Sequence, residues 1–349
     1  MTGSGSWVVT GGAGYVGGHV VGALRRAGID VVVLDDLSTG RPERVPAGVR
    51  RVLGRVDDRR VLDDALAGAA GVVHLAARTS APESVVDPLS HYRANVADVV
   101  TLLAAMADHG ISRLVASSSA AVYGGLPGVP APRAFAESSP LHPQSPYGTT
   151  KMIGELLLAD VASRGLRSIA LRYFNVAGAG SPVLADRKPG GLPPQVLQAC
   201  RTGRPLTVFG TDHPTPDGSA VRDFVHAEDV ADAHVAAVVR LSEGGSGAAV
   251  YNVGTGTGSS VLDVLARAGE VTGSAVPFEV GPRRPGDPSW AVADVSAIHR
   301  DLGWRATRDL TDCLASAWSA LSTAPPPAPG PASPPPADGR WAPQPAAAG

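Results

Sequence analysis

The chain has 349 residues, of which 44% are hydrophobic and 18% charged, and its formal net charge is −2. This balance is typical of a globular protein and gives no reason to expect nucleic acid or an acidic membrane surface as a partner. No apolar run reaches the ~18 residues of a membrane span, and the N-terminus lacks the basic segment of a signal peptide. The two cysteines, Cys200 and Cys313, fit no metal-binding spacing. We therefore expect a cytoplasmic protein that binds no metal, membrane or nucleic acid.

The first half of the sequence alternates short apolar runs with helical segments, which is typical of βαβ units on a parallel sheet. Runs such as VVVL at 31–34 are continuous, as expected for strands covered on both faces. The predicted strands are Trp7–Thr10, Asp30–Leu34, Val49–Leu53, Val72–Ala76, Leu114–Ser118 and Ser168–Tyr173. The predicted helices include His19–Ala27, Val96–His109 and Tyr147–Ser163. The sequence therefore predicts a Rossmann-type, doubly wound α/β fold.

The composition changes midway along the chain. Residues 1–174 are predicted to form the sheet domain, and residues 175–321, which are richer in Gly and Pro, a smaller mixed α/β lobe. An apolar segment at 221–241 is expected to return to the first domain. Residues 322–349 are mostly Pro, Ala and Gly and cannot bury enough apolar surface to offset the entropy cost of ordering. We expect them to form a disordered tail.

Three glycines follow the first predicted strand. Gly11, Gly14 and Gly17 allow a tight turn, a close approach of the backbone to a pyrophosphate, and helix–strand packing. Such a cluster can also mark a mere turn, but Asp35 ends the second strand, where a carboxylate accepts hydrogen bonds from a ribose diol. This pattern predicts a dinucleotide site that favours NAD over NADP, although Arg41 nearby could soften that preference.

Tyr147 and Lys151 are four residues apart, which places both on one face of a helix. A free tyrosine, with a pKa of ~10, is a poor base, but a neighbouring ammonium and a positive nicotinamide ring favour its phenolate. The simpler interpretation is a surface tyrosine and lysine. Ser119 favours the catalytic one, because it lies at the carboxyl end of a predicted strand, where a hydroxyl can bond the same substrate oxygen. A serine run that only caps the strand end is the alternative.

On these residues the chain resembles the extended short-chain dehydrogenase/reductase family, and within it the UDP-glucose 4-epimerase group. The similarity covers about 320 residues. The matching segments are GGAGYVGGH (11–19), LDDLSTG (34–40), HLAA (74–77), SSSAAVYG (117–124), SPYGTTK (145–151), LRYFNVAGA (171–179), FGTDHPTPDGSAVRDFVHAEDVADAH (209–234), YNVGTGTG (251–258), RRPGDP (283–288) and LGW (302–304).

The resemblance implies roles for individual residues. It makes Tyr147 the acid/base, Lys151 its partner and Ser119 the assisting hydroxyl. The implied cofactor residues are Gly11, Gly14, Tyr15, Val16, Gly17, Asp35, Asp36, Leu37, Ser38, Thr39, Gly40, Val56, Leu75, Ala76, Ala77, Asn95, Ser117, Tyr147, Lys151, Tyr173 and Phe174. The implied substrate residues are Ser119, Tyr147, Asn175, Leu192, Val208, Phe209, Arg222, Arg284 and Asp287.

The chemistry of the substrate set agrees with a UDP-sugar. The guanidinium forks of Arg222 and Arg284 suit a diphosphate, and Phe209 offers an apolar surface near uracil. As an alternative, each arginine is part of a surface ion pair.

The activity implied is NAD-dependent epimerisation at C4 of a UDP-hexose through a 4-keto intermediate. Alternatives are a sugar-nucleotide 4-ketoreductase, an epimerase of dTDP-sugars or UDP-pentoses, and a non-catalytic NAD-binding regulatory protein. A dehydratase is disfavoured, because Ala120 and Ala121 stand where it would carry an Asp-Glu pair. The resemblance also implies a homodimer, formed through the predicted helices Val96–His109 and Tyr147–Ser163.

The chain departs from the family pattern at three places. Arg55 follows Gly54 where a carboxylate usually meets the adenine, and Gly191 replaces an Asn or His before Leu192. Ala291 occupies the position of a bulky residue near the sugar, with Trp290 before it. This last change suggests the hypothesis that an N-acetyl group at C2 of the sugar is accepted.

Overall fold

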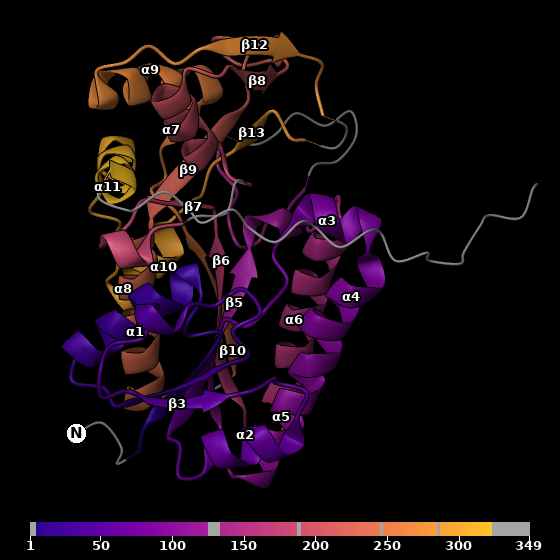
Figure 1. Ribbon diagram of the computed structural model, residues 1–349. Helices are drawn as coiled ribbons and strands as arrows, with labels where there is room; N and C mark the ends of the chain where they lie inside the picture. The colour runs from indigo at the N-terminus through magenta and orange to yellow at the C-terminus, as the bar shows by residue number, and fades with distance from the viewer. Residues whose placement is uncertain (1–4, 125–132, 187–189, 245–246, 285–286, 323–349) are drawn as a thin grey trace, which may run out of the picture.

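A central parallel sheet organises the computed structural model, which describes residues 5–124, 133–186, 190–244, 247–284 and 287–322 (Figure 1). The sheet has seven strands in the order β10-β6-β5-β4-β1-β2-β3. Their bounds are β1 (Trp7–Thr10), β2 (Val31–Asp35), β3 (Arg50–Leu53), β4 (Gly71–His74), β5 (Arg113–Ser119), β6 (Arg167–Tyr173) and β10 (Ala248–Val253). This order confirms the Rossmann-type, doubly wound fold.

Helices cover both faces of this sheet, which explains the continuous apolar runs. One face carries α1 (Tyr15–Arg26), α8 (Ala227–Glu243) and α10 (Ser296–Leu302). The other carries α2 (Arg59–Leu66), α5 (Asp98–Asp108) and α6 (Pro146–Ala162). The short helices α3 (Ala81–Val86) and α4 (Pro88–Tyr92) contact α6 on the outside of this second layer. None of the helices in the described ranges has the length and apolar character needed to cross a bilayer.

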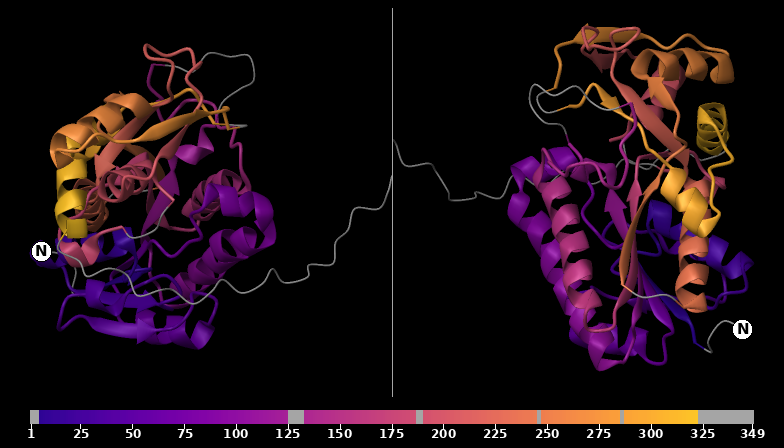
Figure 2. Two further views of the ribbon diagram at one scale, coloured as in Figure 1. Left: turned by 45° about the horizontal axis from the view of Figure 1, so that its top comes forward. Right: turned by 180° about the vertical axis from the view of Figure 1, so that it is seen from behind.

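The remaining elements form a lobe over one end of the sheet, as the further views in Figure 2 also show. A second sheet contains β7 (Asn175–Ala177), β9 (Val221–His226), β11 (Gly258–Ser260) and β13 (Trp290–Ala291), and β8 (Leu206–Phe209) pairs with β12 (Phe278–Gly281). The lobe helices are α7 (Leu192–Thr202), α9 (Val261–Thr272) and α11 (Leu310–Ser322). They enclose a separate apolar core that includes Val196, Leu197 and Val264.

The six strands expected from the first half of the sequence are all in the main sheet, but the seventh was not expected. β10 lies within the range assigned to the lobe, and it joins the main sheet beside β6. The segment at 221–241 also divides differently: β9 belongs to the lobe sheet, and only α8 reaches the main sheet. The tail predicted at 322–349 lies outside the described residues, apart from Ser322 at the end of α11.

The strand order defines where a ligand can bind. The chain runs from β1 to β2 and β3 in one direction, and then through β4, β5 and β6 in the other. In open sheets of this kind, ligands bind at the carboxyl ends of the strands, beside the point where the order reverses. In this protein β6 leads at its carboxyl end into β7, so this edge faces the lobe.

Candidate active site

The turn between β1 and α1 requires glycine at two positions. Gly11 has a φ of +70°, and a β-carbon on it would lie 2.7 Å from the backbone nitrogen of Ala76. A β-carbon on Gly17 would lie 2.0 Å from the carbonyl oxygen of Gly11. Helix α1 begins directly after Gly14, so no side chain at the N-cap covers its first N–H groups. The turn therefore offers backbone donors at a helix N-terminus, which suits the pyrophosphate of NAD.

Asp35 is fixed at the carboxyl end of β2. Its carboxylate accepts hydrogen bonds from the backbone nitrogens of Ala13 (2.9 Å) and Leu37 (2.8 Å). Burial raises the pKa of Asp35, and these two hydrogen bonds act in the opposite direction. Since a carboxylate has about four acceptor positions, it can still accept from a ribose diol. A β-carbon on Gly40 would lie 2.5 Å from this carboxylate, so the loop at 35–40 is closed tightly around it.

Arg55, the departure beside the adenine region, is surrounded by carboxylates. Its guanidinium lies 2.8 Å from Asp57, 3.7 Å from Asp36 and 3.9 Å from Asp98. The side chain of Asp36 in turn accepts hydrogen bonds from Ser38. Arg55 thus balances acidic charge at this edge, in a place where the family pattern has a carboxylate. Arg41, the other arginine near this region, lies 4.0 Å from Glu43.

The segment after β4 is held against the glycine turn. The backbone nitrogen of Leu75 donates to the carbonyl of Thr10 (3.0 Å), and the Thr10 hydroxyl lies 2.8 Å from Nδ1 of His74. Burial lowers the pKa of His74 to about 3, so the imidazole is neutral at pH 7. Of the predicted cofactor residues in this segment, Leu75 and Ala76 therefore lie directly beside Gly11, and Ala77 follows them in the chain.

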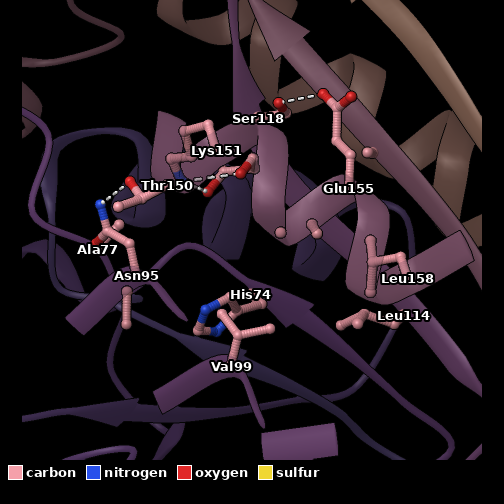
Figure 3. Close-up of a pocket in the computed structure, with 15 residues that line it drawn as sticks. His74, Ala77, Asn95, Val99, Leu114, Ser118, Thr150, Lys151, Glu155 and Leu158 are labelled. Atoms are coloured by element: carbon pink, nitrogen blue, oxygen red, sulfur yellow. Dashed lines mark hydrogen bonds between the residues drawn. The ribbon is translucent and has the colours of Figure 1, made fainter. Parts of the chain in front are cut away.

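Three predicted cofactor residues, Asn95, Val56 and Tyr15, join elements of the protein or lie in its core. The side chain of Asn95 accepts a hydrogen bond from the Arg78 nitrogen (2.8 Å) and donates to the Thr150 hydroxyl (3.0 Å), as Figure 3 shows for Thr150. Asn95 thus links the segment after β4 to α6. Val56 is buried in the core beneath α2 and α5. The hydroxyl of Tyr15 donates to the Gly178 carbonyl (2.6 Å), so this side chain joins α1 to the lobe.

Ser119, Tyr147 and Lys151 meet where β5 ends and α6 begins. The Ser145 side chain caps α6 by accepting from the Gly148 nitrogen (3.2 Å), which fixes the first turn that carries Tyr147. Burial raises the pKa of Tyr147, and a hydrogen bond with the Ser119 hydroxyl acts against this rise. The Lys151 ammonium donates to the carbonyl (2.9 Å) and hydroxyl (3.1 Å) oxygens of Ser117. The three predicted catalytic side chains therefore lie together at the carboxyl edge of the sheet.

Tyr173 and Phe174 follow at the end of β6. The Tyr173 hydroxyl lies 2.6 Å from Nε2 of His234, whose Nδ1 lies 2.8 Å from the Val230 carbonyl. Because a carbonyl only accepts, Nδ1 carries the proton and Nε2 accepts from Tyr173. Burial lowers the pKa of His234 to about 4, which agrees with a neutral ring. Burial also raises the pKa of Tyr173, so this hydroxyl stays protonated. The His234 partner was not anticipated from the sequence.

The predicted substrate residues form two pairs in the lobe. Arg222 donates to the Asp287 carboxylate, and the Arg284 guanidinium lies 3.7 Å from the centroid of the Phe209 ring. Arg284 therefore covers one face of the ring that was expected to face uracil. A hollow of about 620 Å³ adjoins this second pair, between α7 and β8.

The other predicted substrate residues lie on further elements of the lobe. Leu192 begins α7, and Asn175 begins β7 with its side chain exposed. Val208, on β8, is buried in the lobe core. In the described part of the chain, no group of three or more His, Cys, Asp or Glu side chains is arranged to hold a metal ion.

A small cavity of about 30 Å³ lies beneath the Lys151 side chain, between β4, β5 and α6 (Figure 3). It is lined by His74, Asn95, Ser118, Lys151 and Glu155, among others. Glu155 was missed in the sequence, although its position four residues after Lys151 on a predicted helix was the available signal.

The profile of the NAD dependent epimerase/dehydratase family matches residues 7–254. The chain is 44% identical over 322 residues to the UDP-glucose 4-epimerase of Azospirillum brasilense, covering 90% of each chain. It is 42% identical over 321 residues to that of Corynebacterium glutamicum, covering 90% of this chain and 95% of the relative. A solved UDP-glucose 4-epimerase from Bifidobacterium longum, in complex with NAD+ and UDP, has a TM-score of 0.84 and 33% identity, over 91% of this chain and 98% of its own. The protein belongs to the NAD dependent epimerase/dehydratase family.

Proposed function

We propose that the protein is an NAD-dependent isomerase that inverts C4 of UDP-hexoses, interconverting UDP-galactose and UDP-glucose. The observation that carries this proposal is the convergence of Ser119, Tyr147 and Lys151 beside the glycine turn, facing the lobe that holds Arg222 and Arg284. The relatives named UDP-glucose 4-epimerase, which match along nearly the whole chain, support the same activity.

The chain's residues position the sugar and move one proton. Tyr147 takes the proton from the sugar 4-hydroxyl, with the Ser119 hydroxyl bonded to the same oxygen. The glycine turn and Asp35 would hold NAD, which would supply the reversible hydride transfer at C4. The 4-keto sugar stays anchored through its diphosphate, turns its other face, and regains the proton from Tyr147. Because the hydride would be returned to the same sugar in each turnover, no second substrate would be consumed.

Conversion without added cofactor tests the proposal. Purified protein is incubated with UDP-galactose alone, and the sugar nucleotides are separated by chromatography. Formation of UDP-glucose is expected, because the enzyme retains its NAD. Absence of conversion, even with added NAD, would contradict the proposal and favour a 4-ketoreductase or a dTDP-sugar enzyme.

We further propose that UDP-N-acetylhexosamines are accepted. Ala291, at the position where the family pattern has a bulky residue near the sugar, packs with its methyl group against a cluster that contains Phe174 and Tyr123. The indole of the neighbouring Trp290 is held by a hydrogen bond from its Nε1 to the Arg133 carbonyl (2.8 Å). A solved relative from Campylobacter jejuni, with 32% identity and a TM-score of 0.78 over 92% of this chain and 100% of its own, is described as a UDP-Glc/GlcNAc 4-epimerase. Ala291→Tyr is expected to abolish turnover of UDP-N-acetylglucosamine but not of UDP-galactose; equal effects on both would refute the idea.

We also propose a homodimer in a reducing compartment such as the cytoplasm. The outer surface of α3, α4, α5 and α6 exposes apolar side chains that a second copy would cover. These side chains are Val85, Val86, Leu89, Val100 and Leu156, which we call the apolar helix face. The free thiols of Cys200 and Cys313 suit a reducing environment.

A further inference from the structure

A carboxylate that the reaction above does not use lies one helical turn after Lys151 on α6. Glu155 is buried, with 8% of its side chain exposed, and it lines the same small cavity as Lys151. Figure 3 shows its carboxylate turned toward Ser118, in the strand that also carries Ser117, the acceptor for Lys151. Glu155 thus touches both elements that hold the catalytic lysine.

The Glu155 carboxylate is held rigidly. Arg172 of β6 donates to both of its oxygens, from Nε (2.9 Å) and from a terminal nitrogen (2.6 Å). The same guanidinium donates to the Tyr123 hydroxyl (2.9 Å), which donates to Asn252 of β10 (2.6 Å). A bidentate arginine–carboxylate pair of this kind is strong and fixes the orientation of both side chains. The position of Glu155 is therefore set by β5, β6 and β10 together.

The charge of Glu155 acts on a lysine that burial disfavours. Burial lowers the pKa of Lys151 to about 8, and the Glu155 carboxylate acts against this by raising it. The other titratable groups beside Lys151 give no such help: His74 of β4 is neutral, and Tyr147 of α6 is a neutral phenol until it ionises. With a pKa of about 8, Lys151 is close to losing its proton at neutral pH, so its protonated form depends on the negative charge of Glu155.

We propose that Glu155 is a positioning residue for the epimerisation: one turn from Lys151 and bonded to Ser118 and Arg172, it holds the lysine as an ammonium ion against the Ser117 strand end. This inference rests on the proposed function for its catalytic meaning. The effect of the Glu155 charge on the protonation of Lys151 does not depend on which reaction the protein catalyses. The carboxylate acts through Lys151, and Lys151 acts on the Tyr147 phenolate.

The sequence allows a direct measurement, because the chain contains two lysines, Lys151 and Lys188. Protein loaded with NAD and labelled with ¹³C at lysine Cε gives two titrating NMR signals, and Lys188→Arg assigns them. Glu155→Gln keeps an oxygen acceptor for Ser118 and for Nε of Arg172, and removes the charge together with the acceptor of the Arg172 terminal nitrogen. We expect it to lower the titration midpoint of Lys151 by about one pH unit or more, since a unit charge one turn away is lost at a buried site.

Ser118→Ala is the matched control, because it removes the hydrogen bond and keeps the charge. It is expected to leave the Lys151 midpoint where it is in the unsubstituted protein. Glu155→Asp keeps the charge and is expected to bring the midpoint most of the way back from the lowered value of Glu155→Gln. The alkaline limit of kcat/KM should move together with the NMR midpoint in each variant. An unchanged midpoint in Glu155→Gln, or an equal shift in Ser118→Ala, would overturn the inference.

The test allows for a variant that does not fold and for a protein that does not epimerise UDP-galactose. Glu155→Gln leaves Arg172 without its carboxylate, so if that variant does not fold, Glu155→Gln/Arg172→Gln carries the same titration with the same expected direction. The NMR midpoint is read without substrate. A protein that shows the shift but does not epimerise UDP-galactose would refute the proposed function and not the role of Glu155, and the converse result would refute the role of Glu155 only.

Discussion

At the scale of single residues, the hydroxyl of Tyr147 is needed for proton transfer and not for the fold. Tyr147 is partly buried at the first turn of α6, its backbone nitrogen donates to the Ser84 hydroxyl (3.1 Å), and its own hydroxyl bonds Ser119. The fold around Tyr147 is therefore held by groups other than its phenol. Removing the phenol removes the proton acceptor and leaves the fold.

We expect Tyr147→Phe to lower kcat for UDP-galactose by about 10²- to 10⁴-fold, the usual contribution of a positioned acid/base. The measurement is the initial rate of UDP-glucose formation, with bound NAD and thermal unfolding recorded on the same sample. Tyr251→Phe is the control, because Tyr251 lies on β10, away from the site. Comparable loss in both variants would indicate a general effect of removing a tyrosine hydroxyl.

Residues whose role depends on spacing along the chain could be predicted, and residues paired across the fold could not. Gly11, Gly17 and the Tyr147–Lys151 pair are defined by local geometry on a turn or a helix, so the sequence displays them. The pairing of Tyr173 with His234 joins β6 to α8, and no local pattern encodes that distance. Roles in NAD or sugar binding for the remaining predicted residues stay predictions.

At the scale of elements, α1 offers a matched pair of glycines, Gly17 in its first turn and Gly22 farther along the helix. A β-carbon at Gly17 meets the Gly11 carbonyl at 2.0 Å, whereas one at Gly22 meets only the flexible end of Arg26, at 3.4 Å. We expect Gly17→Ala to displace the turn and lose most of the bound NAD. Gly22→Ala should keep the NAD and stabilise the helix by up to about 1 kcal/mol.

Both effects are measured by the absorbance of NAD released on denaturation and by thermal unfolding. Retention of NAD in Gly17→Ala would show that the turn tolerates a side chain and is not the constraint described above. A loss in Gly22→Ala would show that any substitution in α1 disturbs the site.

Elements in the first half of the chain were more predictable than those in the second. β1 and β4 are buried along their whole length, so their sequences are mostly apolar and the strands are easily predicted. β10 is a parallel strand at the sheet edge, half exposed at its start and carrying Asn252, and it therefore lacks that signature. β9 and α8 follow one another without a break, so the boundary between lobe and main sheet within 221–241 carried no signal in the sequence.

At the scale of the whole molecule, buried neutral histidines make the fold sensitive to acid. Burial lowers the pKa of His74 to about 3 and the pKa values of His19 and His234 to about 4. Unfolded histidines titrate near pH ~6.5, so the unfolded chain binds protons that the folded one excludes. The contribution to stability is complete above this pH and declines as the pH falls toward the folded pKa values.

We expect the free energy of unfolding to fall by roughly 1–2 kcal/mol for each of these histidines between pH 7 and pH 5. Denaturant unfolding at several pH values measures the slope, and His74→Gln should reduce it by about one proton. A flat profile over this range would mean that these rings accept protons without unfolding.

The apolar helix face gives a second prediction at this scale. A glutamate at Leu89 places a charge in the proposed dimer contact, and we expect Leu89→Glu to yield monomers in light scattering of the NAD-loaded protein. Val280→Glu is the control, because Val280 is similarly exposed but lies on β12 of the lobe (66% against 58%). A monomeric unsubstituted protein, or dissociation caused equally by the control, would refute the dimer.

The late position of β10 in the chain has a consequence for synthesis on the ribosome. The outer edge of β6 pairs with β10, and about 75 residues of lobe and α8 separate the two strands. At a translation rate of about 5–20 residues per second, β6 stays unpaired on that side for roughly 4–15 s after it emerges. An open edge of this kind can add a strand from another chain. The length of the lobe therefore sets how long each nascent chain is exposed to aggregation before its sheet is complete.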